Sequence, residues 1–147
     1  MREREPVQIA AAGAGAASVL AGIAGFVPGL TTHIGSLSFV GHASGARLFG
    51  VFQVSVLHNL LHLAFGCGIL FARTPAGARA YLLGSGFVYL VLWLVGVIGR
   101  FDWLPANAAD NWLHLVLGLA LFGLLALTSR EDLGDDLERD LRRGLPA

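Results

Sequence analysis

The sequence predicts an all-α membrane protein, a bundle of four transmembrane helices arranged as two tandem helical hairpins. Three observations lead to this prediction. The composition is apolar, with 55% hydrophobic residues, 14% charged residues and a mean hydropathy of +0.68, which is unlike an ordinary soluble domain. The charged residues gather in short clusters separated by long uncharged segments. Four of those segments have the roughly 20 apolar residues that a helix needs to cross a bilayer.

The four predicted helices form a transmembrane domain at residues 1–129. Helices are expected because an isolated strand leaves backbone groups unpaired in lipid, and these segments lack the alternating pattern of barrel strands. Thr74 followed by Pro75 is typical of a helix start, and Asp110 or Asn111 can cap the last helix. The charged residues 130–147 predict a cytoplasmic amphipathic tail. The predicted helices cover about residues 7–29, 48–72, 76–99 and 111–129.

The arginines indicate how the bundle is oriented. If the N-terminus lies inside, only Arg47 and Arg100 fall in outer loops, and the other basic residues all fall on the cytoplasmic side. This is the positive-inside bias of membrane proteins. Phe101, Trp103 and Trp112 gather where an outer aromatic belt is expected. We therefore expect a multi-pass protein of the inner (plasma) membrane with both termini in the cytoplasm.

One phrase occurs twice in the chain. Asn-x-Leu-His-Leu-x-x-Gly begins at Asn59 and again at Asn111. The repetition indicates a tandem duplication of a helical hairpin, with the two halves parallel and related by an axis along the membrane normal. Chance similarity between two Leu-rich helices is the alternative explanation.

Polar side chains within the predicted helices form a candidate site. Steps of three and four residues keep side chains on one face of a helix, so the polar residues of the second, third and fourth helices can meet inside the bundle. We call this set the polar seam. Its members are Ser55, His58, Asn59, His62, Tyr89, Asp110, Asn111 and His114.

The polar seam has three interpretations. The favoured one is structural: its side chains hydrogen-bond across helices and fix their register. In the second, His58, His62 and His114 bind a divalent metal ion, or His62 and His114 bind a haem from facing helices. The third is a small transporter or proton path with Asp110 at its mouth, which is less favoured because no acidic residue lies deep in a predicted span.

Two features restrict the protein's class. The formal net charge is zero, which argues against a nucleic-acid binder, because that class normally needs a basic face to meet phosphates. Cys67 is the single cysteine, so the chain cannot form an intramolecular disulfide.

Four stretches of the sequence carry a family resemblance: residues 50–59, 72–79, 88–93 and 109–114. In these stretches the chain resembles a family of small four-helix membrane proteins, common in actinobacteria and catalogued as a domain of unknown function. The resemblance covers about residues 16–125. It implies a polytopic inner-membrane protein and brings no activity, cofactor or catalytic residue to transfer.

From these observations we expect an envelope or accessory subunit without catalytic activity of its own. Its expected partners are the lipid bilayer and a larger membrane complex or a second copy of the chain. No resident cofactor is expected under the structural interpretation, and haem or a divalent metal ion is expected under the alternative.

Overall fold

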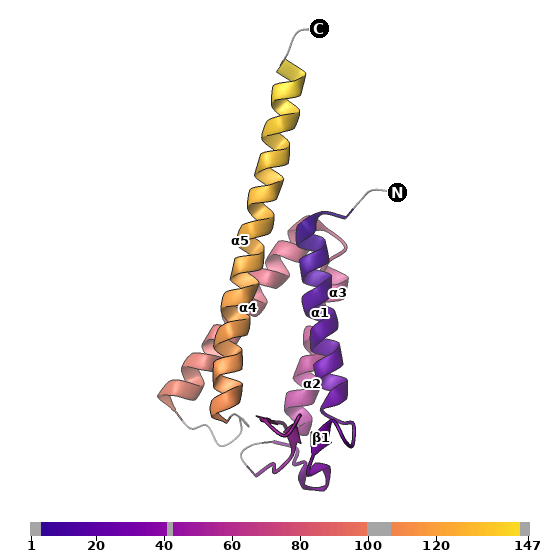
Figure 1. The fold of residues 1–147 in the computed structure, drawn as a ribbon, viewed down its shortest axis with the longest axis vertical. Coiled ribbons are helices and arrows are strands. Elements are labelled where there is room, and N and C mark those ends of the chain that lie inside the picture. Colours follow the sequence, from indigo (N-terminus) through magenta and orange to yellow (C-terminus); the bar gives the residue numbers. More distant parts are fainter. Residues whose placement is uncertain (1–3, 41–42, 100–106, 145–147) are drawn as a thin grey trace.

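A computed structural model describes residues 4–40, 43–99 and 107–144 (Figure 1). Most of these residues are helical, as predicted, and three of the helices are long and apolar enough to cross a membrane. A small antiparallel sheet, which was not predicted, lies at one end of the helices. In chain order the elements are α1 (Pro6–Ala24), β1 (Thr31–Thr32), a 3-10 turn (Ile34–Ser36), β2 (Arg47–Leu48), β3 (Phe52–Gln53), α2 (Val56–Phe65), α3 (Gly68–Phe71), α4 (Pro75–Ile98) and α5 (Ala108–Gly144).

The helices pack as two pairs. α1 packs against α2 and α3, and α4 packs along α5, while α1 joins the pairs by touching both α4 and α5. The core between them is built from small and aliphatic side chains on α1 and α4, including Val7, Ala11, Ala78 and Leu82, all with no exposed surface. Small side chains let the backbones of apolar helices approach closely.

The first helix starts and stops for local reasons. Glu5 and Gln8 form a reciprocal capping box, and Pro6 occupies the first turn, where its missing N–H costs nothing. The helix ends at Ala24 rather than at residue 29 as predicted. Beyond it, the Thr31 hydroxyl donates to the Ala24 carbonyl at 3.0 Å, so the chain turns back toward the sheet before it reaches Pro28.

The second predicted helix, residues 48–72, is wrong in its first third. Residues 47–53 form a hairpin of β2 and β3 in which Leu48 pairs with Phe52. Phe49 and Gly50 both have positive φ, 52° and 72°, which suits the tight turn of a hairpin and is incompatible with a right-handed helix. Hydropathy did not distinguish the hairpin from a helix, because Val51, Phe52 and their neighbours are apolar residues whichever structure they form.

The remainder of that segment is a helix with a break. α2 begins at Val56, where the Ser55 hydroxyl accepts the His58 N–H at 3.2 Å. α2 and α3 are separated by a turn at Gly66 and Cys67, but the backbone N–H of each of these two residues still bonds to a carbonyl of α2. The chain can therefore change direction here without leaving unpaired backbone groups, which would be costly in lipid.

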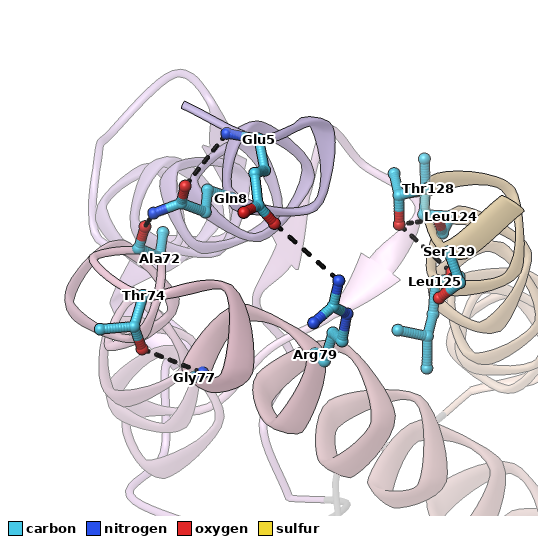
Figure 2. Close-up of polar contacts among 10 residues, drawn as sticks. All are labelled: Glu5, Gln8, Ala72, Thr74, Gly77, Arg79, Leu124, Leu125, Thr128 and Ser129. Carbon is cyan, nitrogen blue, oxygen red and sulfur yellow. Dashed lines mark hydrogen bonds and ion pairs between the residues drawn. The ribbon is translucent and has the colours of Figure 1, made fainter. Parts of the chain in front are cut away.

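Polar contacts join the helix ends farthest from the sheet (Figure 2). The Gln8 amide donates to the Ala72 carbonyl at 2.8 Å and so links the start of α1 to the end of α3. The predicted start of α4 is confirmed, since the Thr74 hydroxyl accepts the Gly77 N–H at 3.1 Å. Arg79 lies 3.9 Å from Glu5, a half-exposed pair that contributes little stability.

The last helix is longer than predicted. α5 runs without interruption from Ala108 to Gly144, so the predicted last span and the predicted amphipathic tail belong to one continuous helix, whose apolar part is Ala108–Arg130. The hydroxyls of Thr128 and Ser129 donate to carbonyls one turn earlier within α5 (Figure 2), which lets polar residues continue the helix. The end of α5 projects well beyond the other helices (Figure 1).

Two predictions concern residues outside the described part of the chain. One is that Phe101 and Trp103 lie in the outer aromatic belt, and the other is that Arg100 lies in an outer loop. Trp112 is described and is 66% exposed on α5.

The fold generates a prediction about sidedness. The α3–α4 connection and the projecting end of α5 lie at one end of the helices, and the β2–β3 hairpin lies at the other (Figure 1). In a Cys67→Ser background, we expect Arg73→Cys and Leu137→Cys to react with a membrane-impermeant maleimide from the same side, and Val51→Cys from the opposite side. Labelling of all three positions from one side of intact cells or inverted vesicles would contradict a spanning arrangement.

Candidate functional site

A small cavity lies between the two helical pairs, against the sheet. Its volume is about 160 Å³, which is room for about five water molecules at ~30 Å³ each. Apolar side chains of α1, α5 and the β2–β3 hairpin form most of its wall. Its polar lining consists of His58, Asn59, His62, Asp110 and His114.

Three imidazole rings lie side by side in this cavity. His58 and His62 are one helical turn apart on α2, with their Nε2 atoms 3.0 Å apart and their ring centres 4.8 Å apart. The ring of His114 on α5 stacks 6.4 Å from that of His58 and 5.7 Å from that of Tyr89 on α4. Packing of α5 against the first helical pair therefore brings the histidines of both repeated phrases together.

The two asparagines of the repeated phrases face glycines on the preceding helices. A Cβ at Gly25, where α1 ends, would collide with the Asn59 side chain, and a Cβ at Gly96 on α4 would collide with that of Asn111. Asn59 is 1% exposed, and neither of its side-chain polar atoms has a hydrogen-bond partner within the described part of the chain. Asn111 is turned away from the cavity lining.

Asp110 fastens the start of α5 to the sheet. It is 2% exposed, and its Oδ2 accepts the backbone N–H groups of Gln53 and Asn107, each at 3.0 Å. The Asn107 Oδ1 accepts the Asp110 N–H in return, at 2.9 Å. Asn107, and not Asp110 or Asn111 as predicted, is therefore the residue at which the helix is capped. A buried carboxylate is tolerated because backbone dipoles surround it.

Further hydrogen bonds extend this anchor into the turn of the β2–β3 hairpin and into the loop between β1 and β2. The Asn107 amide donates to the Val51 carbonyl at 2.7 Å, and the Gln53 amide donates to the Ser44 carbonyl at 2.7 Å. The Ser44 hydroxyl in turn donates to the Val54 carbonyl at 2.5 Å. Side chains thus supply hydrogen-bond partners for backbone carbonyls in a segment with little regular secondary structure.

The structure brings some members of the polar seam together and separates others. His58, Asn59, His62, Asp110 and His114 share the cavity. The remaining three have other surroundings: Ser55 caps α2, Tyr89 packs behind His114, and Asn111 lies against α4.

Gln53, Asn107 and Ser44 were missed by the sequence analysis. Asn107 and Asp110 have the three-residue spacing of a capping box, so that signal was present in the sequence. Gln53 gave no such signal, because its role depends on a contact between residues 57 apart.

The chemistry available at the cavity is that of imidazole and amide groups. Across residues 4–40, 43–99 and 107–144, no group of three or more His, Cys, Asp or Glu side chains is arranged to hold a metal ion. His62 and His114 each have a buried Nδ1 that lacks a partner among the same residues. Within that part of the chain, the cavity therefore has two imidazole nitrogens without a hydrogen-bond partner.

The Asp110 anchor can be tested by removing its acceptor. Asp110→Ala leaves two part-buried backbone N–H groups without their acceptor, at up to roughly 1–3 kcal/mol each, so we expect the detergent-solubilised protein to unfold at a lower temperature. Hydrogen exchange should rise at Gln53 and Asn107 in particular. Glu138→Ala, at an exposed acid on the same helix, should change neither measurement. Unchanged exchange at Gln53 in Asp110→Ala would show that the anchor is not needed.

Comparison with known proteins adds the family to this picture. Residues 8–127 match the family described as domain of unknown function DUF4383. The comparisons with curated proteins and with solved structures found no match. The matched residues include α1 to α4, the sheet, the cavity and most of the apolar part of α5. The chain belongs to the family of the domain of unknown function DUF4383.

Proposed function

We propose that this chain is a non-catalytic, multi-pass protein of the inner (plasma) membrane that acts as an envelope or accessory subunit. One observation carries the proposal: Asp110, the buried acid at the sheet end, holds backbone groups of the same chain. An acid that accepts two backbone hydrogen bonds supports architecture, whereas a general acid or base must face a reacting group.

The surfaces of the helices support a membrane location. Large apolar side chains are exposed along α1, α4 and α5, among them Leu20 (67%), Phe87 (64%) and Leu119 (57%). A soluble monomer rarely exposes apolar surface so widely. Lipid or an apolar partner would cover it, which fits the composition of the chain.

We infer that α2 and α3 together make the fourth span of the bundle. The segment Val56–Phe71 is apolar, but at 1.5 Å per residue it extends only roughly 24 Å, less than a hydrocarbon core of about 30 Å. The sheet and its loop continue this segment at one end. Their hydrogen-bonded backbone suits the position of a non-helical segment that closes a short span.

We infer that both termini face the cytoplasm. The start of α1, the α3–α4 connection and the end of α5 share one end of the molecule (Figure 1). That end carries most of the arginines, including Arg73, Arg79 and Arg130, while Arg47 in β2 lies at the other. The positive-inside rule then supports the cytoplasm as the location of the arginine-rich end.

We further propose that the two helical pairs are a tandem duplication. Asn59 lies against Gly25 in the first pair, and Asn111 lies against Gly96 in the second. Gly96 follows Gly25 by 71 residues, and Asn111 follows Asn59 by 52 residues. The same two sequence separations relate another pair of contacts. A Cβ at Gly66 would lie 3.7 Å from the Gly15 carbonyl, and one at Gly118 would lie 3.1 Å from the Gly86 carbonyl.

Repeated contacts are stronger support than a repeated phrase. Similar letters arise by chance in Leu-rich helices, but such chance gives no reason for the matching residues to meet matching partners. In a tandem duplication, the Asn–Gly contact is a packing arrangement that occurs once in each helical pair.

This contact can be tested within α4. We expect Gly96→Ala to destabilise the protein by about 1–3 kcal/mol, because the added methyl group collides with Asn111. Gly84→Ala, on the same helix with nothing within 4 Å of the added Cβ, should be neutral or slightly stabilising. Adding Asn111→Ala to Gly96→Ala should recover part of the loss in unfolding measurements. Equal effects of the two alanines would contradict the packing role of Gly96.

The subunit role can be tested by native electrophoresis. After mild detergent extraction from its own membranes, the 15.5 kDa chain should migrate in a complex larger than one copy, and the complex should collapse to the single chain in denaturing detergent. A tagged chain expressed alone shows whether self-association accounts for the size. Migration as a single copy in both preparations would refute the accessory-subunit proposal.

A further inference from the structure

The two histidines on α2 make a contact with each other that is not needed for packing between helices. His58 and His62 direct their Nε2 atoms toward each other at 3.0 Å. The interaction lies within a single helix, so it does not fix the register between helices. Both residues also line the cavity.

The spacing of these nitrogens is close to that of two ligands on one metal ion. Imidazole nitrogen binds zinc at about 2.0–2.1 Å, so two such ligands at angles of about 90–109° lie roughly 2.9–3.4 Å apart. The observed 3.0 Å falls in this range. An ion could replace the shared proton of the pair with little movement of either side chain.

The surroundings provide what a bound ion would need. His114 supplies a third imidazole from α5, its ring 6.4 Å from that of His58. The Asp110 carboxylate lies on the same wall and supplies negative charge, which a buried cation requires. Asn59 and the 160 Å³ cavity leave room for water to complete the coordination.

We propose that His58 and His62 form a two-nitrogen clip for a divalent first-row transition-metal ion, and that His114 completes the site when the ion enters. The ion is preferred to haem because of size. A cavity of about 150 Å³ accommodates one benzene ring, and a porphyrin contains four pyrrole rings. No three His, Cys, Asp or Glu side chains among the described residues are already arranged to hold a metal ion, so the proposal requires His114 to move toward the pair when the ion enters.

The probe for this proposal is Cu²⁺, which binds nitrogen sites most tightly among these ions. The full chain, purified in detergent with a tag that contains no histidine, should take up one Cu²⁺. Its electron paramagnetic resonance spectrum should show hyperfine coupling to at least two nitrogens. Zn²⁺ should compete for the same site.

Variants then assign the ligands. We expect His62→Gln and His58→Gln each to weaken Cu²⁺ binding by about tenfold or more and to remove one nitrogen coupling. His114→Gln should change the spectrum with a smaller loss. His33→Ala serves as the matched control, because His33 lies in the loop between β1 and the 3-10 turn and should leave both readouts unchanged.

The outcomes separate this proposal from the subunit role. Stoichiometric Cu²⁺ that is lost in His58→Gln and His62→Gln, in proteins whose unfolding temperature is retained, supports the clip. No uptake, or uptake that survives both substitutions, would overturn it and leave the pair as a hydrogen bond within α2. Neither result changes the expected migration in native electrophoresis, so a failure of the clip is distinguishable from a failure of the subunit proposal.

Discussion

The Asp110 carboxylate accepts backbone hydrogen bonds from Gln53 in β3 and from Asn107 at the start of α5, and the sheet end of the molecule depends on this interaction. A backbone donor buried without an acceptor costs roughly 1–3 kcal/mol. Strand and helix can therefore meet there only because an acceptor is supplied. Once the start of α5 is fixed at this point, His114, one helical turn after Asp110, lies beside the histidines of α2.

Glycine sets how closely the helices of each pair approach. Apolar helices in lipid gain little from burying more apolar surface, so their association depends on close packing and on polar contacts. Gly25 and Gly96 provide space for an asparagine of the neighbouring helix, and Gly15 lies so close to α3 that an added Cβ would come within 2.8 Å of the Ile69 nitrogen. Both helical pairs therefore use glycine to allow a close approach.

The cavity is a consequence of these two constraints acting together. The core of Val7, Ala11, Ala78 and Leu82 fills the space between the pairs. The cavity lies between the pairs toward the anchored sheet, which closes it at one end. Polar residues can be held there because the backbone around them is already satisfied, in the hairpin by Ser44, Gln53 and Asn107. The Nε2 atoms of the two histidines on α2 lie 3.0 Å apart at this cavity, and the metal proposal rests on that spacing.

The sequence alone determined the features that depend on local chemistry. Its apolar segments predicted the long helices α1, α4 and the apolar part of α5, and Thr74 and Pro75 predicted where α4 begins. The tertiary structure decided what neighbours in space impose. Residues 47–53 became a hairpin because Gln53 pairs with Asp110 across 57 positions of sequence, and an apolar strand has the same hydropathy as an apolar helix. α5 continued past residue 129 because helix propagation depends on backbone hydrogen bonds and not on whether the side chains face lipid or water.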